Sequence, residues 1–339
     1  MVEFRYHILT IGAIFLALAV GIILGAGPLQ DSIVRALNSQ VESLSDTNAE
    51  LKAENIMLAE ENARHNEAIE AIAPFLTEGA LADREIGIVI LPGSTEEAVQ
   101  SVRQRLADAG AQVNVEVSLA EGWSSETAAT ARDELAEQLR PLLPSLTPDA
   151  STTIVLSTAL DQVLRNGSDS EIGAPLAGYL MEFHEPLVEV STDLGLPVEA
   201  VVVIAPDTDD VGLEEVATDD SAVLEHAQRD AESYVELISQ FAATGPTVAA
   251  GAADSATDVV RQLRNAGIDA STVDNIPSGV GSINIVVAIA NELNGMLVHL
   301  GYEDGASAGL GERAEAPREV IDPEVAEQGT EADQNVEAE

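Results

Sequence analysis

The segment "IGIVILPGSTEEAVQSVRQRLADAGAQVNVEVS", residues 86–118, has the pattern of a strand, a helix and a second strand. Its first apolar run ends at Pro92-Gly93. The stretch from Ser94 to Gly110 has helical spacing, with Ser94 as the predicted N-cap and Glu97 three residues later. Residues 111–118 alternate between apolar and polar side chains, as a half-buried strand does. Because two strands joined by a helix are usually parallel, the segment predicts an α/β fold.

The same alternation returns farther along the chain. We expect strands at residues 200–207, 246–251 and 268–276, and helices at residues 221–245, 254–267 and 278–295. Residues 128–185 are predicted to be mostly helical, with breaks at prolines, and Trp123 is expected to anchor a loop. The sequence therefore predicts an extracytoplasmic α/β domain over residues 84–302, with a mainly parallel sheet flanked by helices.

An uncharged segment near the N-terminus predicts a membrane anchor. Residues 8–27, "ILTIGAIFLALAVGIILGAG", could cross a hydrocarbon core of about 30 Å as a helix. A cleaved signal peptide is the alternative, but its apolar region is usually only about 7–15 residues. We therefore expect residues 1–29 to be a short cytoplasmic end and a single transmembrane helix. Positive residues favour the cytoplasmic side of a membrane helix. Arg5 precedes the segment, whereas Arg35 after it is offset by Asp31, so we expect the N-terminus to be cytoplasmic.

Residues 30–74 carry a heptad pattern that predicts a parallel coiled coil. Leucine at d positions favours two strands, whereas asparagine at a positions lowers stability but selects partner number and register. The predicted interface has Val34, Val41, Asn48, Asn55, Asn62 and Ile69 at a, and Leu37, Leu44, Leu51, Leu58, His65 and Ile72 at d. The coil would form a homodimer or pair with another protein, and Pro74 is expected to end it. The alternative is a helix packed against its own domain, which would tolerate asparagine on a partly wet face.

Composition excludes several classes of function. The formal net charge is −44, from 59 acidic and 15 basic residues, so the surface repels the phosphates of nucleic acids. The absence of cysteine excludes thiolate catalysis and cysteine-ligated metal sites. Residues 303–339 contain many acidic residues and no periodicity, which predicts a disordered acidic tail.

No motif for catalysis, cofactor binding or a resident metal is present. The turn Pro92-Gly93-Ser94 and the segment "SGVGS" at residues 278–282 could each hold an anion at a helix start, but ordinary turns explain them better. The five histidines are scattered, and the four methionines form no cluster that would suit Cu(I). The acidic segment 207–220 lacks the spacing of a calcium-binding EF-hand loop. We therefore expect no catalytic, cofactor-binding or metal-binding residues and no enzymatic activity.

Three segments together resemble the MctB family of actinobacterial envelope proteins, which are labelled copper transporters. They are "FRYHILTIGAIFLALAVGIILGAGPL", the heptad region, and "STVDNI…GSINIVVAIANELNG…HLGY". The resemblance spans the chain from Met1 to about Tyr302 and implies a single anchor with the bulk of the protein outside the cytoplasmic membrane. The resemblance implies one of two functions. The first is copper transport or efflux, with copper homeostasis across the envelope. The second, as in the member SteB, is cell separation and control of a peptidoglycan hydrolase, together with the membrane partner SteA.

The residues favour the second of these functions. A lone transmembrane helix cannot enclose a pore without oligomerising, and a two-stranded coil would supply only two copies. We therefore expect a non-enzymatic scaffold or regulator, with a SteA-like membrane protein and a cell-wall hydrolase as partners. Copper transport, with copper as the bound partner, is the alternative.

Overall fold

The computed structural model describes residues 3–192, 194–207 and 220–317. The chain divides into two compact units, with the boundary between His65 and Asn66. Each unit is described separately below.

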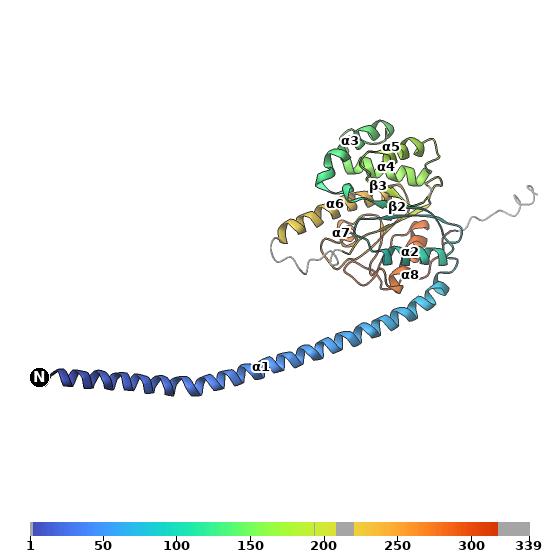
Figure 1. Ribbon diagram of the computed structural model, residues 1–339. Helices are drawn as coiled ribbons and strands as arrows, with labels where there is room; N and C mark the ends of the chain where they lie inside the picture. Colours follow the sequence, from blue (N-terminus) through green and yellow to red (C-terminus); the bar gives the residue numbers. More distant parts are fainter. Residues whose placement is uncertain (1–2, 193, 208–219, 318–339) are drawn as a thin grey trace, which may run out of the picture. The chain divides into compact units, whose positions relative to one another are not determined.

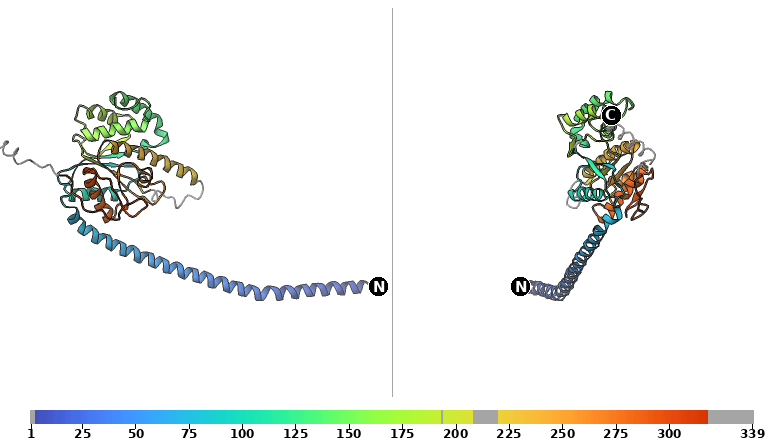
Figure 2. Two further views of the ribbon diagram at one scale, coloured as in Figure 1. Left: turned by 180° about the vertical axis from the view of Figure 1, so that it is seen from behind. Right: turned by 90° about the vertical axis from the view of Figure 1, so that its right-hand side faces the viewer.

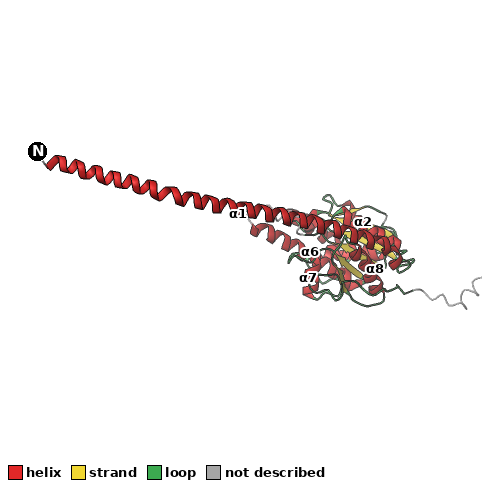
Figure 3. Cartoon of the chain, turned by 90° about the horizontal axis from the view of Figure 1, so that it is seen from below, coloured by secondary structure: helices red, strands yellow, loops and turns green. Residues whose placement is uncertain are grey.

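Helix α1 (Glu3–Thr77) is unbroken (Figures 2 and 3). Its segment Tyr6–Ile23 is long and apolar enough to cross a membrane, a criterion that a signal sequence near the N-terminus also meets. The helix continues beyond Pro74, contrary to the predicted end of the coil. Pro74 lacks an N–H to donate, but hydrogen bonding resumes directly after it: Glu78 N donates to Pro74 O at 2.8 Å, and the buried Thr77 hydroxyl donates to Ala73 O at 3.0 Å.

The second unit contains a sheet with strand order β3-β2-β1-β4-β5-β6-β7. Neighbouring strands are parallel except for β3, which runs antiparallel to β2. The strands are β1 (Glu85–Ile90), β2 (Gln112–Leu119), β3 (Val188–Val190), β4 (Ala200–Ile204), β5 (Thr247–Ala250), β6 (Ser271–Val273) and β7 (His299–Leu300). The predicted α/β class with a mainly parallel sheet is confirmed. Strands β3 and β7 were not predicted, because runs of three and two residues are too short to show a period.

Helices cover both faces of this sheet (Figure 1). One face packs against α2 and α8, and the other packs against α3 to α7. These helices are α2 (Glu96–Asp108), α3 (Ala129–Leu139), α4 (Thr152–Asn166), α5 (Gly173–Glu182), α6 (Asp220–Thr244), α7 (Val259–Ala266) and α8 (Gly279–Leu293). The predicted helical middle region is confirmed as α3, α4 and α5.

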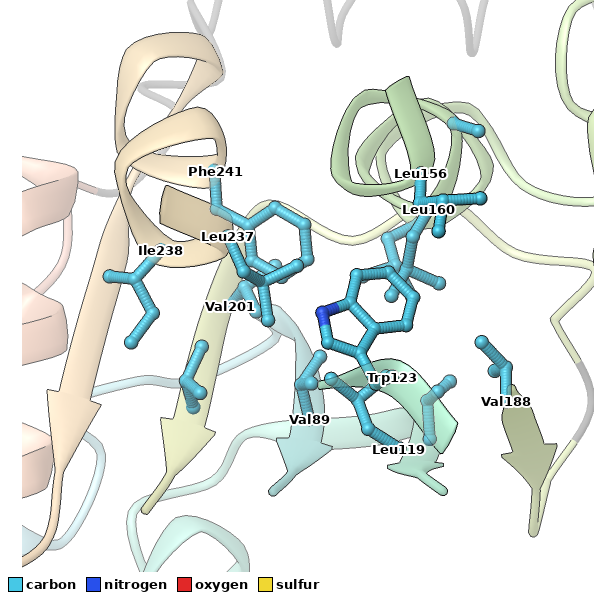
Figure 4. Packing of buried hydrophobic residues seen from close by; sticks show 14 of the residues in the cluster. Val89, Leu119, Trp123, Leu156, Leu160, Val188, Val201, Leu237, Ile238 and Phe241 are labelled. Atoms are coloured by element: carbon cyan, nitrogen blue, oxygen red, sulfur yellow. The ribbon is translucent and has the colours of Figure 1, made fainter. Parts of the chain in front are cut away.

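The larger core cluster is built mainly from aliphatic side chains around Trp123 and Phe241. Trp123 closes the short 3₁₀ helix Glu121–Trp123 that follows β2, and it is 1 % exposed. Its indole points between the sheet and Leu156 and Leu160 of α4 (Figure 4). Trp123 therefore anchors this loop, as predicted.

The N-cap of α2 differs from the predicted one. Thr95, not Ser94, accepts the hydrogen bond from the N–H of Ala98, at 3.3 Å. The Ser94 hydroxyl instead donates to the carbonyl of Ile204 at the end of β4, at 3.0 Å. Two adjacent hydroxyl residues can each cap a helix, and contact with β4 decides which one does.

The packed domain also extends beyond the predicted end at residue 302. Gly311 N donates to Asn284 Oδ1 at 2.9 Å, Ala316 N donates to Ala80 O at 2.8 Å, and Ala316 is buried. The prediction of a disordered tail is therefore wrong for residues 303–317, which main-chain hydrogen bonds hold in place. Composition does not reveal such bonds, because nearly every residue type carries the same backbone donor and acceptor. The rest of the predicted tail, residues 318–339, lies outside the described residues.

Replacing Phe241 by alanine should lower the free energy of unfolding by about 3–5 kcal/mol, because the ring is fully buried and its removal leaves a cavity. Denaturant unfolding of the full chain in detergent micelles measures the change. Phe75→Ala is the matched control, because Phe75 is 74 % exposed and should give little change. Equal effects of the two substitutions would contradict the described core.

Candidate functional site

Most of the predicted coiled-coil positions form an exposed stripe along α1, here called the heptad stripe. Its apolar members Leu37, Val41, Leu44, Leu51 and Leu58 are 48–72 % exposed in the single chain. Asn48, Asn55, Asn62 and His65 are exposed as well, and the side chain of Val34 lies outside the described residues. Leucines left in water along a helix carry a hydrophobic cost that a second helix would remove. The existence of that second helix stays a prediction.

Ile69 does not belong to the exposed stripe. It packs against the core cluster that contains α8. A Cβ atom on Gly279, the first residue of α8, would lie 2.8 Å from Ile69 Cγ2, so only glycine allows this approach. Its own domain therefore buries part of Ile69, and the assignment of Ile69 to a partner interface stays a prediction. Ile72 remains 53 % exposed.

Polar contacts fix the last turns of α1 on the domain. Asn66 Oδ1 accepts a hydrogen bond from Gly279 N at 2.7 Å. Glu70 forms an ion pair with Arg105 of α2. The guanidinium of Arg105 is almost fully buried and also pairs with Asp108 at 3.0 Å and donates to Ser282 Oγ at 3.2 Å. One side of residues 66–77 therefore packs against its own domain, whereas Ile72 and Phe75 stay exposed. Pairing of this part of the helix with a partner stays a prediction.

The two glycine-containing turns considered as anion sites are engaged by the protein itself. At the start of α8, Asn66 accepts from Gly279 N, and the Ser278 hydroxyl accepts from Gly281 N at 3.1 Å. The first turn of α2 carries Glu96 and Glu97, whose carboxylates disfavour a bound anion. Both segments act as ordinary helix starts.

The family-like segments "STVDN" and "HLGY" meet at one buried carboxylate. Asp274 is fully buried and forms an ion pair with Arg264 at 2.8 Å. Its oxygens accept from Tyr302 N at 2.7 Å and Glu303 N at 3.2 Å. A side chain on Gly301, which has φ +136°, would overlap this carboxylate. Asp274 therefore holds the loop after β7 in place.

A second polar pair extends this network. Arg264 Nε donates to Thr272 Oγ1 at 2.8 Å, and the same hydroxyl lies 2.9 Å from His299 Nδ1. Burial, and to a smaller extent the charge of Arg264, lowers the pKa of His299. His299 is thereby favoured in its neutral form inside a structural network.

The described residues hold no group of three or more histidine, aspartate or glutamate side chains placed to bind a metal ion. Met57, Met181 and Met296 are each more than half exposed. Met181 lies in α5 and Met296 follows α8, so these two thioethers come from separate elements. Met1 lies outside the described residues.

A family model described as "Copper transport outer membrane protein, MctB" matches residues 1–310. The chain belongs to the MctB family. Among curated relatives, "Copper transporter MctB" of Mycobacterium bovis is 25 % identical over 322 residues, covering 90 % of this chain and 98 % of the relative. Proteins of the same name from two strains of Mycobacterium tuberculosis match to the same extent. The family match covers the anchor segment, the heptad stripe and nearly all of the described α/β domain.

Sequence reasoning missed the contacts that join these parts. Asp274 lies within the quoted "STVDN" segment, which marks it as distinctive, but nothing in the pattern pairs it with Arg264. Likewise, the heptad spacing continues through Ile69, although Ile69 contacts the core cluster of its own domain. Pairing across distant segments has no local signal.

Replacing Asp274 by alanine should lower the free energy of unfolding by about 3–5 kcal/mol, because the buried guanidinium of Arg264 would lose its counter-charge. Denaturant unfolding of the full chain measures this. In Asp304→Ala, the removed carboxylate is 89 % exposed and pairs loosely with Arg261 at 3.4 Å, so almost no change is expected. A small effect of Asp274→Ala would show that the buried network does not stabilise the domain.

Proposed function

We propose that this MctB-family chain is a non-enzymatic, membrane-anchored envelope scaffold that associates through the heptad stripe. The exposed row of leucines interrupted by Asn48, Asn55 and Asn62 carries this proposal. Leucine at d supplies association, while buried asparagines penalise wrong registers and partner numbers. A weak but selective coil suits a protein that exchanges partners.

The attachment of α1 to the domain supports a scaffold. Asn66, Glu70 and Ile69 tie the last turns of the helix to α2 and α8. A partner bound to the heptad stripe would therefore engage a helix that is continuous with the core of the α/β domain. Association through the heptad stripe would thus bring two α/β domains, or one such domain and a partner protein, to the same place on the membrane.

The finer assignment follows from the resemblance. It implies cell separation, with a SteA-like membrane protein and a peptidoglycan hydrolase as partners. In this arrangement the segment Tyr6–Ile23 spans the cytoplasmic membrane once, the N-terminus is cytoplasmic, and the α/β domain lies in the extracytoplasmic space. Purification of the tagged full-length protein from membranes, followed by identification of bound proteins, tests these partners.

Copper transport is the second candidate. The description of the family and the names of the mycobacterial relatives favour it. Copper handling by this chain would depend on thioether and imidazole groups, since cysteine is absent. Oligomers would be needed to form a path through the membrane, because each chain has one described helix of sufficient length and apolarity.

The full-length protein in detergent should sediment as a dimer at concentrations on the order of 10 µM. Replacing Asn48, Asn55 and Asn62 together by leucine should tighten self-association by roughly 10-fold or more, or produce higher oligomers, because the selective amides are removed. A control with Asp46, Ala53 and Glu60 changed to leucine places the same number of leucines at f positions and should leave the dimer affinity unchanged. A wild-type monomer that also captures no helical partner from membranes would overturn the proposal.

Copper binding separates the two candidates. Titration of the full-length protein with Cu(I) against a competing chelator should show no sub-micromolar site. Tight binding that is lost on changing Met181, Met296 or His299 would instead favour copper transport. Substitution of Met181, which is 52 % exposed, by leucine keeps the side-chain volume and serves as the first variant.

A further inference from the structure

The last turns of α1 carry two apolar stripes that face different directions. One stripe lies against the α/β domain: Ala73 is fully buried, and Ile69 packs against the core cluster that contains α8. The other stripe is exposed and is here called the base patch; it consists of Ala68, Ile72, Phe75 and Leu76. A helix turns by about 100° per residue, so Ile72 points about 100° away from Ala73. The domain therefore leaves the base patch uncovered.

The base patch exposes apolar side chains to water on one face of the helix. Phe75 is 74 % exposed and Leu76 is 42 % exposed in the single chain. The members of the patch have the spacing i, i+4, i+7 and i+8, which is that of a helix face packed against another element. Apolar side chains exposed singly need no explanation, whereas neighbouring ones on a single face indicate a contact surface.

The heptad spacing indicates which element would cover the base patch. Counting from the a position at Asn62 gives d at Ile72 and a at Leu76. These two residues therefore continue the d and a positions of the heptad stripe, and Ala68 and Phe75 fall on g positions beside that seam. A second helix that follows the heptad stripe in phase would reach the base patch before α1 ends.

The chemistry of the base patch favours a second copy of this chain as the occupant. In a parallel pair in register, each a or d residue meets the same residue of the other chain, so apolar Ile72 and Leu76 meet apolar counterparts. Two copies with a net charge of −44 each repel over most of their surface. The base patch carries no charge, and its g positions, where coiled coils often have charged residues, are Ala68 and Phe75. Like charges therefore do not oppose pairing at this place.

We propose that the heptad stripe pairs with a second copy of this chain, in parallel and in register, and that the contact continues through the base patch. This inference rests on the association proposed above and names its partner. The last turns of α1 then pack on their own domain with one side and on the second copy with the other. The pairing thereby fixes the two α/β domains relative to each other, because the contact extends to the part of α1 that is attached to the domain.

Disulfide cross-linking tests this pairing directly, because the chain has no cysteine of its own. Single cysteines are placed in the full-length protein in detergent at Leu51 of the heptad stripe and at Ile72 and Leu76 of the base patch. Two cysteines form a disulfide only when their Cα atoms lie within about 7 Å, as at a and d of a parallel coil in register. After oxidation with diamide, Leu51→Cys, Ile72→Cys and Leu76→Cys should all run as dimers in non-reducing denaturing electrophoresis. Glu60→Cys and Glu67→Cys, at exposed f positions, are the matched controls and should remain monomers.

The pattern of cross-links separates this inference from the proposed function. Cross-linking of Leu51→Cys without cross-linking of Ile72→Cys and Leu76→Cys would overturn the inference and leave the scaffold intact, because the helices would pair along the stripe and diverge before the domain. No cross-link at any of these positions would overturn both the inference and self-association through the heptad stripe. Cross-linking of Glu67→Cys to the same extent as Ile72→Cys would reveal random collisions and would also refute the pairing.

Truncation of the base patch should weaken the dimer. Changing Ile72 and Phe75 together to alanine should raise the dissociation constant by at least ~10-fold in sedimentation of the full-length protein, because less apolar surface is buried between the copies. The matched control changes Leu142 and Leu196 to alanine, since both are exposed and lie outside the base patch. Unfolding of the α/β core should not change, because the coil weakened by asparagines dissociates first. An unchanged dissociation constant, in protein that circular dichroism shows to be folded, would overturn the proposal.

Discussion

The buried guanidinium of Arg105 constrains how α1 joins the domain. Its side chain is almost completely excluded from water, and its partners come from three helices: Glu70 of α1, Asp108 of α2 and Ser282 of α8. Asp108 compensates the charge of Arg105 from the same helix, and Glu70 adds a second carboxylate from α1, so the ion pair favours attachment of the end of α1. Asn66 and the close packing of Ile69 against Gly279 act at the same junction. The last turns of α1 therefore pack with one side on the folded domain.

The position of β1 between β2 and β4 organises the domain itself. Connections that step in opposite directions along the sheet lie on opposite faces: α2, between β1 and β2, covers one face, and α6 and α7, between β4 and β6, cover the other. Helix α8 departs from this rule, because it joins β6 to β7 and yet packs on the face of α2. At this reversal a cavity of about 350 Å³ lies between the loops after β1 and β4. At the edge of the sheet formed by β7, the buried ion pair of Asp274 and Arg264 holds the loop after this strand in place.

Local patterns were sufficient for most of the secondary structure. The apolar runs around residues 86–90 and 200–204 predicted β1 and β4, and helical spacing predicted α2, α6 and α8. The patterns were insufficient where long-range contacts choose between local alternatives. Thr95 caps α2 because Ser94 contacts β4, and Ile69 faces α8 although the heptad spacing assigns it to a partner. The segment 303–317 has an acidic, aperiodic composition and yet packs through main-chain hydrogen bonds.

The sequence by itself determined the fold class, the apolar N-terminal segment and the spacing of leucines and asparagines along α1, because each depends on the period of side chains along one element. The tertiary structure alone decided that Asn66 and Ile69 contact α8, and that Asp274 joins "STVDN" to the loop after Leu300. These features depend on which distant residues meet. Such pairing follows from strand order and helix packing, which periodicity within one segment does not encode.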